Sequence, residues 1–234
     1  MLQGLPPSVD WVEIDVRRSA DGVPVVFHDE TISTGERAGS LSYDFLSNLG
    51  VRSLRDFIQE LPAAINVVLD VKNSIDDAAS PHSRTTSRIT AQAIKENISG
   101  HAILLTSFDP AIVMSFRRDS PLRAVGLTTW QGVPLRESIP TAAALNIDVL
   151  AVHIDALRPY GIELGDSRAT LATHVDLAHE VGLQLACWGG KELSRSDVDY
   201  LAELGVDAIY MDEQNIWDMS HDATGARNDM TNDL

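Results

Sequence analysis

Cysteine is almost absent from this chain of 234 residues, because Cys187 is its single one. A lone cysteine cannot form an internal disulfide, which excludes a small secreted fold held together by disulfides. Positive charge is also scarce: 18 lysines and arginines face 34 acidic residues, for a formal net charge of −16. Because nucleic acids and anionic membranes attract basic surfaces, this balance argues against both as main partners. A phosphate substrate stays open, since a bound divalent cation can reverse the local charge.

Long apolar runs are missing as well. No stretch reaches the roughly 18–20 consecutive apolar residues that a membrane-spanning helix needs. The first residues, Met1–Pro7, lack the basic segment that opens a signal peptide. We therefore expect no integral membrane segment and a cytoplasmic location.

What is present is a regular alternation of short apolar runs with amphipathic stretches, which predicts an α/β fold. Strands are expected at 9–16, 65–71, 102–106, 123–128, 148–152, 183–188 and 206–211. Helices are expected at 53–60, 85–98, 109–117, 135–145, 169–181 and 193–204. This repetition favours a (β/α)8 TIM barrel over an open doubly wound sheet. No strand fits before residue 9, so the barrel is expected to lack its first βα unit, with a domain over 1–217 and a disordered acidic tail over 218–234.

The first predicted strand carries carboxylates on one side. Glu13 and Asp15 are separated by a single residue, and alternate residues of a strand point to the same face. Two like charges in an apolar setting are costly unless a cation or a base neutralises them. The Asp21–Gly22 turn then predicts a β-excursion over 24–34 that brings His28 back over the pair. These residues predict a site for a metal ion and acid/base chemistry.

A second strand end adds an acid and a base. Asp70 and Lys72 end the run that begins at Ile65, and they again share one face. Carboxylates gathered at the mouth of a barrel form an oxygen-rich site that suits Mg²⁺ or Ca²⁺ better than zinc. Beside such a metal, Lys72 is suited to bind phosphate, and His28 can move a proton to or from an alcohol oxygen near neutral pH. The combination predicts phosphodiester cleavage, with catalytic roles for His28 and Lys72.

Each of these features alone has a plainer explanation. Glu13 and Asp15 fit a solvated pair in a loop, and His28 fits a turn residue. Asp70 and Lys72 fit an ordinary surface salt bridge. Their joint occurrence at the ends of apolar strands, where barrel active sites lie, favours the functional interpretation.

Several segments of the chain resemble the glycerophosphodiester phosphodiesterase family. The most specific is the block from Glu13 to Asp29, which resembles the family's E-x-D…D-G-x-x-V-x-x-H-D signature. Further likenesses follow in order at Val51–Phe57, Val68–Lys72, Thr106–Pro110, Cys187–Trp188 and Gly205–Asp212. The resemblance covers about residues 9–215 and implies a TIM barrel. The roles that it implies are metal ligation by Glu13, Asp15 and Asp70, acid/base work by His28, phosphate contact by Lys72 and substrate contact by Trp188.

The resemblance implies a metal-dependent hydrolysis of glycerophosphodiesters, small-molecule substrates, to sn-glycerol 3-phosphate and an alcohol. The family's H-R-G strand end and P-E-N-T helix start, which precede the acid pair, have no counterpart in the sequence. The H-R-G histidine is half of the family's acid/base pair, so weak turnover is expected. Two alternatives follow: a catalytically inactive barrel that binds phosphodiesters or a partner, and, because Asp70 replaces the family's glutamate, a sphingomyelinase D-like phospholipase. An incomplete barrel would also expose sheet edges that a second copy, in a homo-oligomer, could cover.

Overall fold

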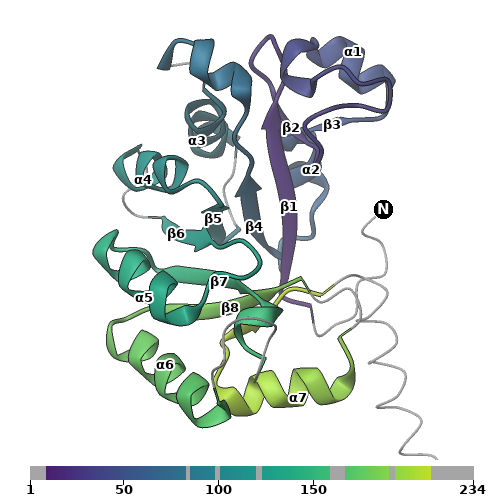
Figure 1. The fold of residues 1–234 in the computed structure, drawn as a ribbon. Helices are drawn as coiled ribbons and strands as arrows, with labels where there is room; N and C mark the ends of the chain where they lie inside the picture. Colours follow the sequence, from purple (N-terminus) through teal and green to yellow (C-terminus); the bar gives the residue numbers. More distant parts are fainter. Residues whose placement is uncertain are drawn as a thin grey trace, which may run out of the picture. The chain divides into compact units, whose positions relative to one another are not determined.

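The computed structural model describes residues 9–82, 85–97, 101–119, 123–158, 167–189 and 193–211 (Figure 1). The chain divides into two compact units. The N-terminal unit comprises residues 9–128, and the described part of the C-terminal unit begins at Thr129. The predicted tail over 218–234 lies outside the described residues, so its disorder stays a prediction.

Parallel strands form the centre of the N-terminal unit. In the order of their hydrogen bonding they are β1 (Trp11–Arg18), β4 (Asn66–Val71), β5 (Ile103–Ser107) and β6 (Ala124–Thr128). Figure 1 shows β1 as the long purple arrow beside the blue β4. Along β4 the apolar side chains are buried, as expected for a parallel strand covered on both faces. The four strands expected in this part of the sequence are therefore confirmed, each to within two residues.

The predicted β-excursion after β1 is also present. The chain turns at Gly22, whose φ of 85° suits glycine, and returns as β2 (Pro24–Val26), antiparallel to β1. β2 in turn pairs with the short strand β3 (Arg52–Ser53). Val25 packs in a small apolar cluster with Ile32 and Leu46, and Phe27 lies against that cluster. This packing anchors the segment that leads into His28.

Helices follow the strands of the N-terminal unit. They are α1 (Tyr43–Asn48), α2 (Leu54–Glu60), α3 (Thr86–Asn97) and α4 (Pro110–Asp119), with the 3₁₀ turns η1 (Ala38–Ser40) and η2 (Ile75–Ala79). α4 begins as the sequence predicts, with a proline in its first position and the Asp109 carboxylate accepting from the Ala111 N–H at 2.8 Å. Of these helices, α1 was not expected from the sequence. Within the parts of the chain that the structure describes, none of the helices combines the length and apolarity required to cross a membrane.

The C-terminal unit repeats the strand–helix pattern. Its elements are β7 (Val149–His153), β8 (Gln184–Trp188) and β9 (Ala208–Ile209), with α5 (Leu135–Ala144), η4 (Ile154–Ala156), α6 (Arg168–Glu180) and α7 (Arg195–Leu204). β7 pairs with β8, and β8 pairs with β9, in parallel. α7 opens with a capping box between Ser194 and Asp197. The strands and helices expected here are found, although β9 is shorter than the run over 206–211 from which it was predicted.

Candidate active site

Acidic side chains meet on one face of the N-terminal unit because of the pairing register. β1 and β4 run parallel with Asp15 directly opposite Asp70, so these carboxylates lie side by side. Glu13, two residues earlier on β1, projects to the same face. Each of the three offers an oxygen within 4.8 Å of the other two. We call Glu13, Asp15 and Asp70 the acidic cluster.

Lys72 lies directly against the acidic cluster. Its Nζ donates to Asp15 Oδ1 at 2.8 Å and to Asp70 Oδ2 at 2.5 Å. The Lys72 ammonium also stands over the Phe108 ring, 5.4 Å from the ring centre. The Thr106 hydroxyl donates to Asp70 Oδ1 at 3.3 Å from the neighbouring strand. Lys72 thus bridges Asp15 on β1 and Asp70 on β4 and is not the partner of Asp70 alone.

The electrostatics of the acidic cluster favour a cation. Loss of water around the Glu13 carboxyl, and then repulsion by Asp15 and Asp70, raise its pKa to about 8, against the opposing effect of Lys72. The Glu13 side chain as a whole is exposed, so solvent screens part of this effect. Attraction by both aspartates raises the pKa of Lys72 although burial lowers it, so Lys72 stays charged. A group of carboxylates that retains a proton near neutral pH is short of positive charge, which a divalent cation would supply.

The donor chemistry fits magnesium or calcium. All the ligands on offer are carboxylate oxygens, which hard cations prefer, and Asp70 is 6% exposed, so its position is fixed by packing. The predicted ligand set Glu13, Asp15 and Asp70 is therefore brought together in space. That these residues hold a metal ion, and whether the ion is Mg²⁺ or Ca²⁺, stays a prediction.

His28 lies just beyond β2, which runs antiparallel to β1. The Phe27 N–H donates to the Asp15 carbonyl oxygen at 3.1 Å, which fixes the residue before His28 against the acidic strand. The His28 side chain itself is 69% exposed, and its Nδ1 lies 2.8 Å from Asp29 Oδ1. With Nδ1 directed to Asp29, Nε2 is left for a proton exchange with a ligand. This arrangement is compatible with the predicted acid/base role but does not test it.

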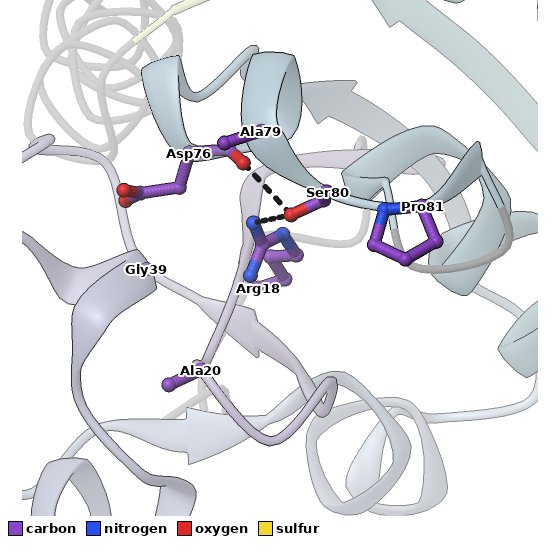
Figure 2. Close-up of a pocket in the computed structure, with 7 residues that line it drawn as sticks. All are labelled: Arg18, Ala20, Gly39, Asp76, Ala79, Ser80 and Pro81. Carbon is purple, nitrogen blue, oxygen red and sulfur yellow. Dashed lines mark hydrogen bonds between the residues drawn. The ribbon is translucent and has the colours of Figure 1, made fainter.

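A network around Arg18 stabilises the other face of β1. Arg18 is 4% exposed, and its Nε donates to Asp77 Oδ1 at 2.8 Å while its Nη2 donates to the Ser80 hydroxyl at 2.9 Å. A cavity of about 260 Å³ lies beside this network. Figure 2 shows residues that line it, with the Ser80 hydroxyl donating in turn to the Asp76 carbonyl oxygen. Arg37 pairs with the Asp76 carboxylate at 2.9 Å, so the charges around the cavity cancel. The network thus attaches η2, which follows Lys72 in the sequence, to the end of β1.

Trp188 belongs to the C-terminal unit, at the end of β8. Its indole Nε1 donates to the Thr129 carbonyl at 3.2 Å, and its ring meets the His153 ring edge to face at 4.7 Å. The His153 Nδ1 accepts from the Asp155 N–H at 3.2 Å, which fixes the imidazole. Gly189, with φ of 89°, lies so close to His153 that a Cβ there would collide with the ring. Trp188 is held in one orientation by these contacts, while its predicted substrate role stays a prediction.

Comparison with known proteins decides the family. The sequence profile of the glycerophosphoryl diester phosphodiesterase family matches residues 7–215. The chain belongs to this family. The resemblance drawn from the E-x-D and H-D block is thereby confirmed, and with it the classification as a phosphodiester hydrolase.

Solved structures of the family share the fold. One is a glycerophosphodiester phosphodiesterase from Parabacteroides distasonis, with 20% identity, a TM-score of 0.69 and coverage of 91% of this chain and 84% of that one. Another is an Oleispira antarctica phosphodiesterase in complex with the product sn-glycerol-3-phosphate, with 17% identity, a TM-score of 0.69 and coverage of 90% and 86%. A third, from Galdieria sulphuraria, has 18% identity, a TM-score of 0.70 and coverage of 87% and 82%. No curated protein sequence matches this chain. These likenesses confirm the α/β fold with parallel strands that the barrel prediction requires.

Two residues of the site were not found from the sequence. Thr106 supports Asp70 from the adjacent strand, and Arg17 donates to backbone carbonyls at the site's rim. Thr106 could have been found, since it lies next to the end of a strand that pairs with the Asp70 strand. Arg17 follows Asp15 by two residues, so its face was predictable, but its partners were not.

Proposed function

We propose that this chain hydrolyses glycerophosphodiesters to sn-glycerol 3-phosphate and an alcohol, with a divalent cation held by the acidic cluster. The observation that carries the proposal is the meeting of Glu13, Asp15 and Asp70 within 4.8 Å in a member of a phosphodiesterase family. The Oleispira relative, crystallised with sn-glycerol-3-phosphate, supports the choice of product. When bound, Mg²⁺ or Ca²⁺ would draw electron density from the phosphoryl oxygens.

Within this proposal, side chains of the protein bind the phosphoryl group, transfer the proton and contact the rest of the substrate. Lys72, already held against the cluster by two ion pairs, is placed to meet a phosphoryl oxygen as a fixed positive charge. His28 would pass a proton to the departing alcohol oxygen, because Asp29 holds its Nδ1 and leaves Nε2 to the substrate. Trp188 would contact the organic part of the substrate with an aromatic face.

The test is product analysis with glycerophosphocholine and Mg²⁺ or Ca²⁺. We expect release of sn-glycerol 3-phosphate and choline together, loss of both with EDTA, and loss of both in Asp15→Asn. Asp56→Asn, a change in α2 away from the cluster, serves as the matched control and should leave the rate unchanged. Absence of sn-glycerol 3-phosphate at any ion concentration, with the chain folded, would refute the proposal.

The two alternatives give different outcomes in the same experiment. A sphingomyelinase D-like enzyme would release choline from sphingomyelin faster than from glycerophosphocholine. An inactive barrel would bind glycerophosphocholine without releasing either product. The expected weakness of turnover can be judged here too, because loss of one acid/base group costs about 10²–10⁴ in rate.

A further inference from the structure

Arg17 connects the strand ends that carry the candidate site. It follows Asp15 by two residues on β1, so it projects to the face of the acidic cluster. Its Nε donates to the His28 carbonyl oxygen at 2.8 Å, and its Nη1 donates to the Asn73 carbonyl oxygen at 3.0 Å. His28 follows β2, and Asn73 follows Lys72 at the end of β4. One guanidinium therefore ties the segments of both proposed catalytic residues to β1.

The His28 segment depends on this connection. The ring of His28 hydrogen-bonds to Asp29, its neighbour in sequence, which does not fix it against β1. Upstream, the Phe27 N–H reaches the Asp15 carbonyl at 3.1 Å, and downstream the Glu30 carbonyl accepts from the Ala38 N–H at 2.9 Å. Between these points, the bond from Arg17 to the His28 carbonyl holds the loop beside the strand.

Arginine is the residue type that suits this position. A guanidinium presents N–H groups in fixed, diverging directions, so it can satisfy two carbonyls on separate segments at once. A lysine ammonium in the same place carries the charge but cannot reproduce this planar geometry. Arg17 is half-buried, and burial lowers the pKa of its guanidinium, while the carboxylates of Glu30, Asp15, Asp29 and Asp70 act in the opposite direction. Both the planar shape and the positive charge of arginine therefore suit this position.

We propose that Arg17 is a positioning residue, which acts on the reaction by holding the His28 segment and the Lys72–Asn73 segment in register. The inference rests on the proposed function, since it assigns an effect on that reaction. It does not require Arg17 to touch the substrate. Displacement of a proton-transferring group by about 1 Å can cost on the order of 10²-fold in rate, which sets the size of the expected effect.

The test is a double-mutant cycle with Arg17→Lys and His28→Asn. We expect Arg17→Lys alone to lower kcat by about 10- to 100-fold, with KM and the Kd for Mg²⁺ changed by less than about threefold. Added to His28→Asn, Arg17→Lys should lower kcat by a smaller factor than in the wild-type chain, because one of the two residues that it positions is already gone. Arg52→Lys, which removes another half-buried guanidinium that donates to a backbone carbonyl, is the control and should leave kcat unchanged. An equal fractional loss from Arg17→Lys with and without His28 would overturn the proposal.

A second measurement separates this inference from the proposed function. Amide hydrogen exchange, followed by mass spectrometry, should be faster in Arg17→Lys for peptides that cover residues 27–30, and unchanged in α4. This outcome requires no catalytic activity. If the wild-type chain releases no product but exchange over 27–30 accelerates, the proposed function fails while the positioning of this segment stands. If exchange over 27–30 is unchanged in Arg17→Lys, the positioning role is wrong whatever the activity.

Discussion

The proposed metal binding should depend on pH in a direction that the protonation state of Glu13 sets. Its pKa of about 8 means that most molecules hold a proton on this predicted ligand at neutral pH. A carboxyl group must lose its proton to bind a metal, so affinity for Mg²⁺ or Ca²⁺ should rise as the pH rises. Glu13 is ionised in about 1% of molecules at pH 6 and in about half at pH 8, which corresponds to an affinity gain of about 50-fold. Because the side chain is exposed, solvent screening makes this ratio an upper limit.

Isothermal titration calorimetry measures both consequences. Between pH 6 and pH 8 the Kd should fall, and at pH 7 titrations in buffers of different ionisation enthalpy should show nearly one proton released for each ion bound. Glu13→Gln should bind more weakly and lose the pH dependence, while Glu60→Gln, a surface change beside Arg52, should behave as wild type. A Kd that is constant over this range, or a pH dependence that survives in Glu13→Gln, would refute the reasoning.

Other predictions concern the residues around the cluster. Lys72→Met removes the ammonium that competes with a cation for the acidic cluster, so the Kd for Mg²⁺ should fall by about tenfold. The same change should lower kcat by at least about 10²-fold. Weaker binding of Mg²⁺ would contradict this. In EDTA the free energy of unfolding should decrease as the pH rises from about 4.5 to about 8, because the folded state holds the Glu13 proton that the unfolded state has lost. Urea titrations of Glu13→Gln should show a smaller decrease over the same pH range. Arg18→Met leaves Asp77 without its buried partner and should cost about 3 kcal/mol in urea unfolding, much of it recovered by Asp77→Asn. Trp188→Ala should raise KM by about tenfold and change kcat by less than about threefold; a loss confined to kcat would argue against substrate contact.

Most of the fold, and the residues of the acidic cluster, could be predicted from the periodicity of apolar residues along the sequence. Strand periodicity put Glu13 and Asp15 on one face, and the parallel arrangement placed Asp70 at the adjacent strand end. The register that sets Asp15 opposite Asp70 is seen only in the structure, because the pairing of two parallel strands does not by itself fix which residues lie opposite each other. Lys72 was predicted to share the Asp70 face, but its second ion pair, to Asp15, required the register.

What the sequence did not predict depends on contacts between distant segments. The partners of Arg17 are backbone carbonyls of His28 and Asn73. Because every residue has a backbone carbonyl, the sequence cannot indicate which ones accept a hydrogen bond. The Arg18 network joins residues about sixty positions apart through η2, which has no periodic pattern of its own. Helix α1 is six residues long, too short for its apolar spacing to stand out from a loop, although Ser42 caps it.

The most direct test of the account is a crystal of this chain soaked in Mn²⁺, which shares the oxygen-ligand preference of Mg²⁺ and scatters anomalously. The account predicts an anomalous peak within coordination distance of Glu13, Asp15 and Asp70, with the Lys72 ammonium moved off at least one aspartate. A density map without a peak at this position, with Lys72 still paired to both aspartates, would contradict it.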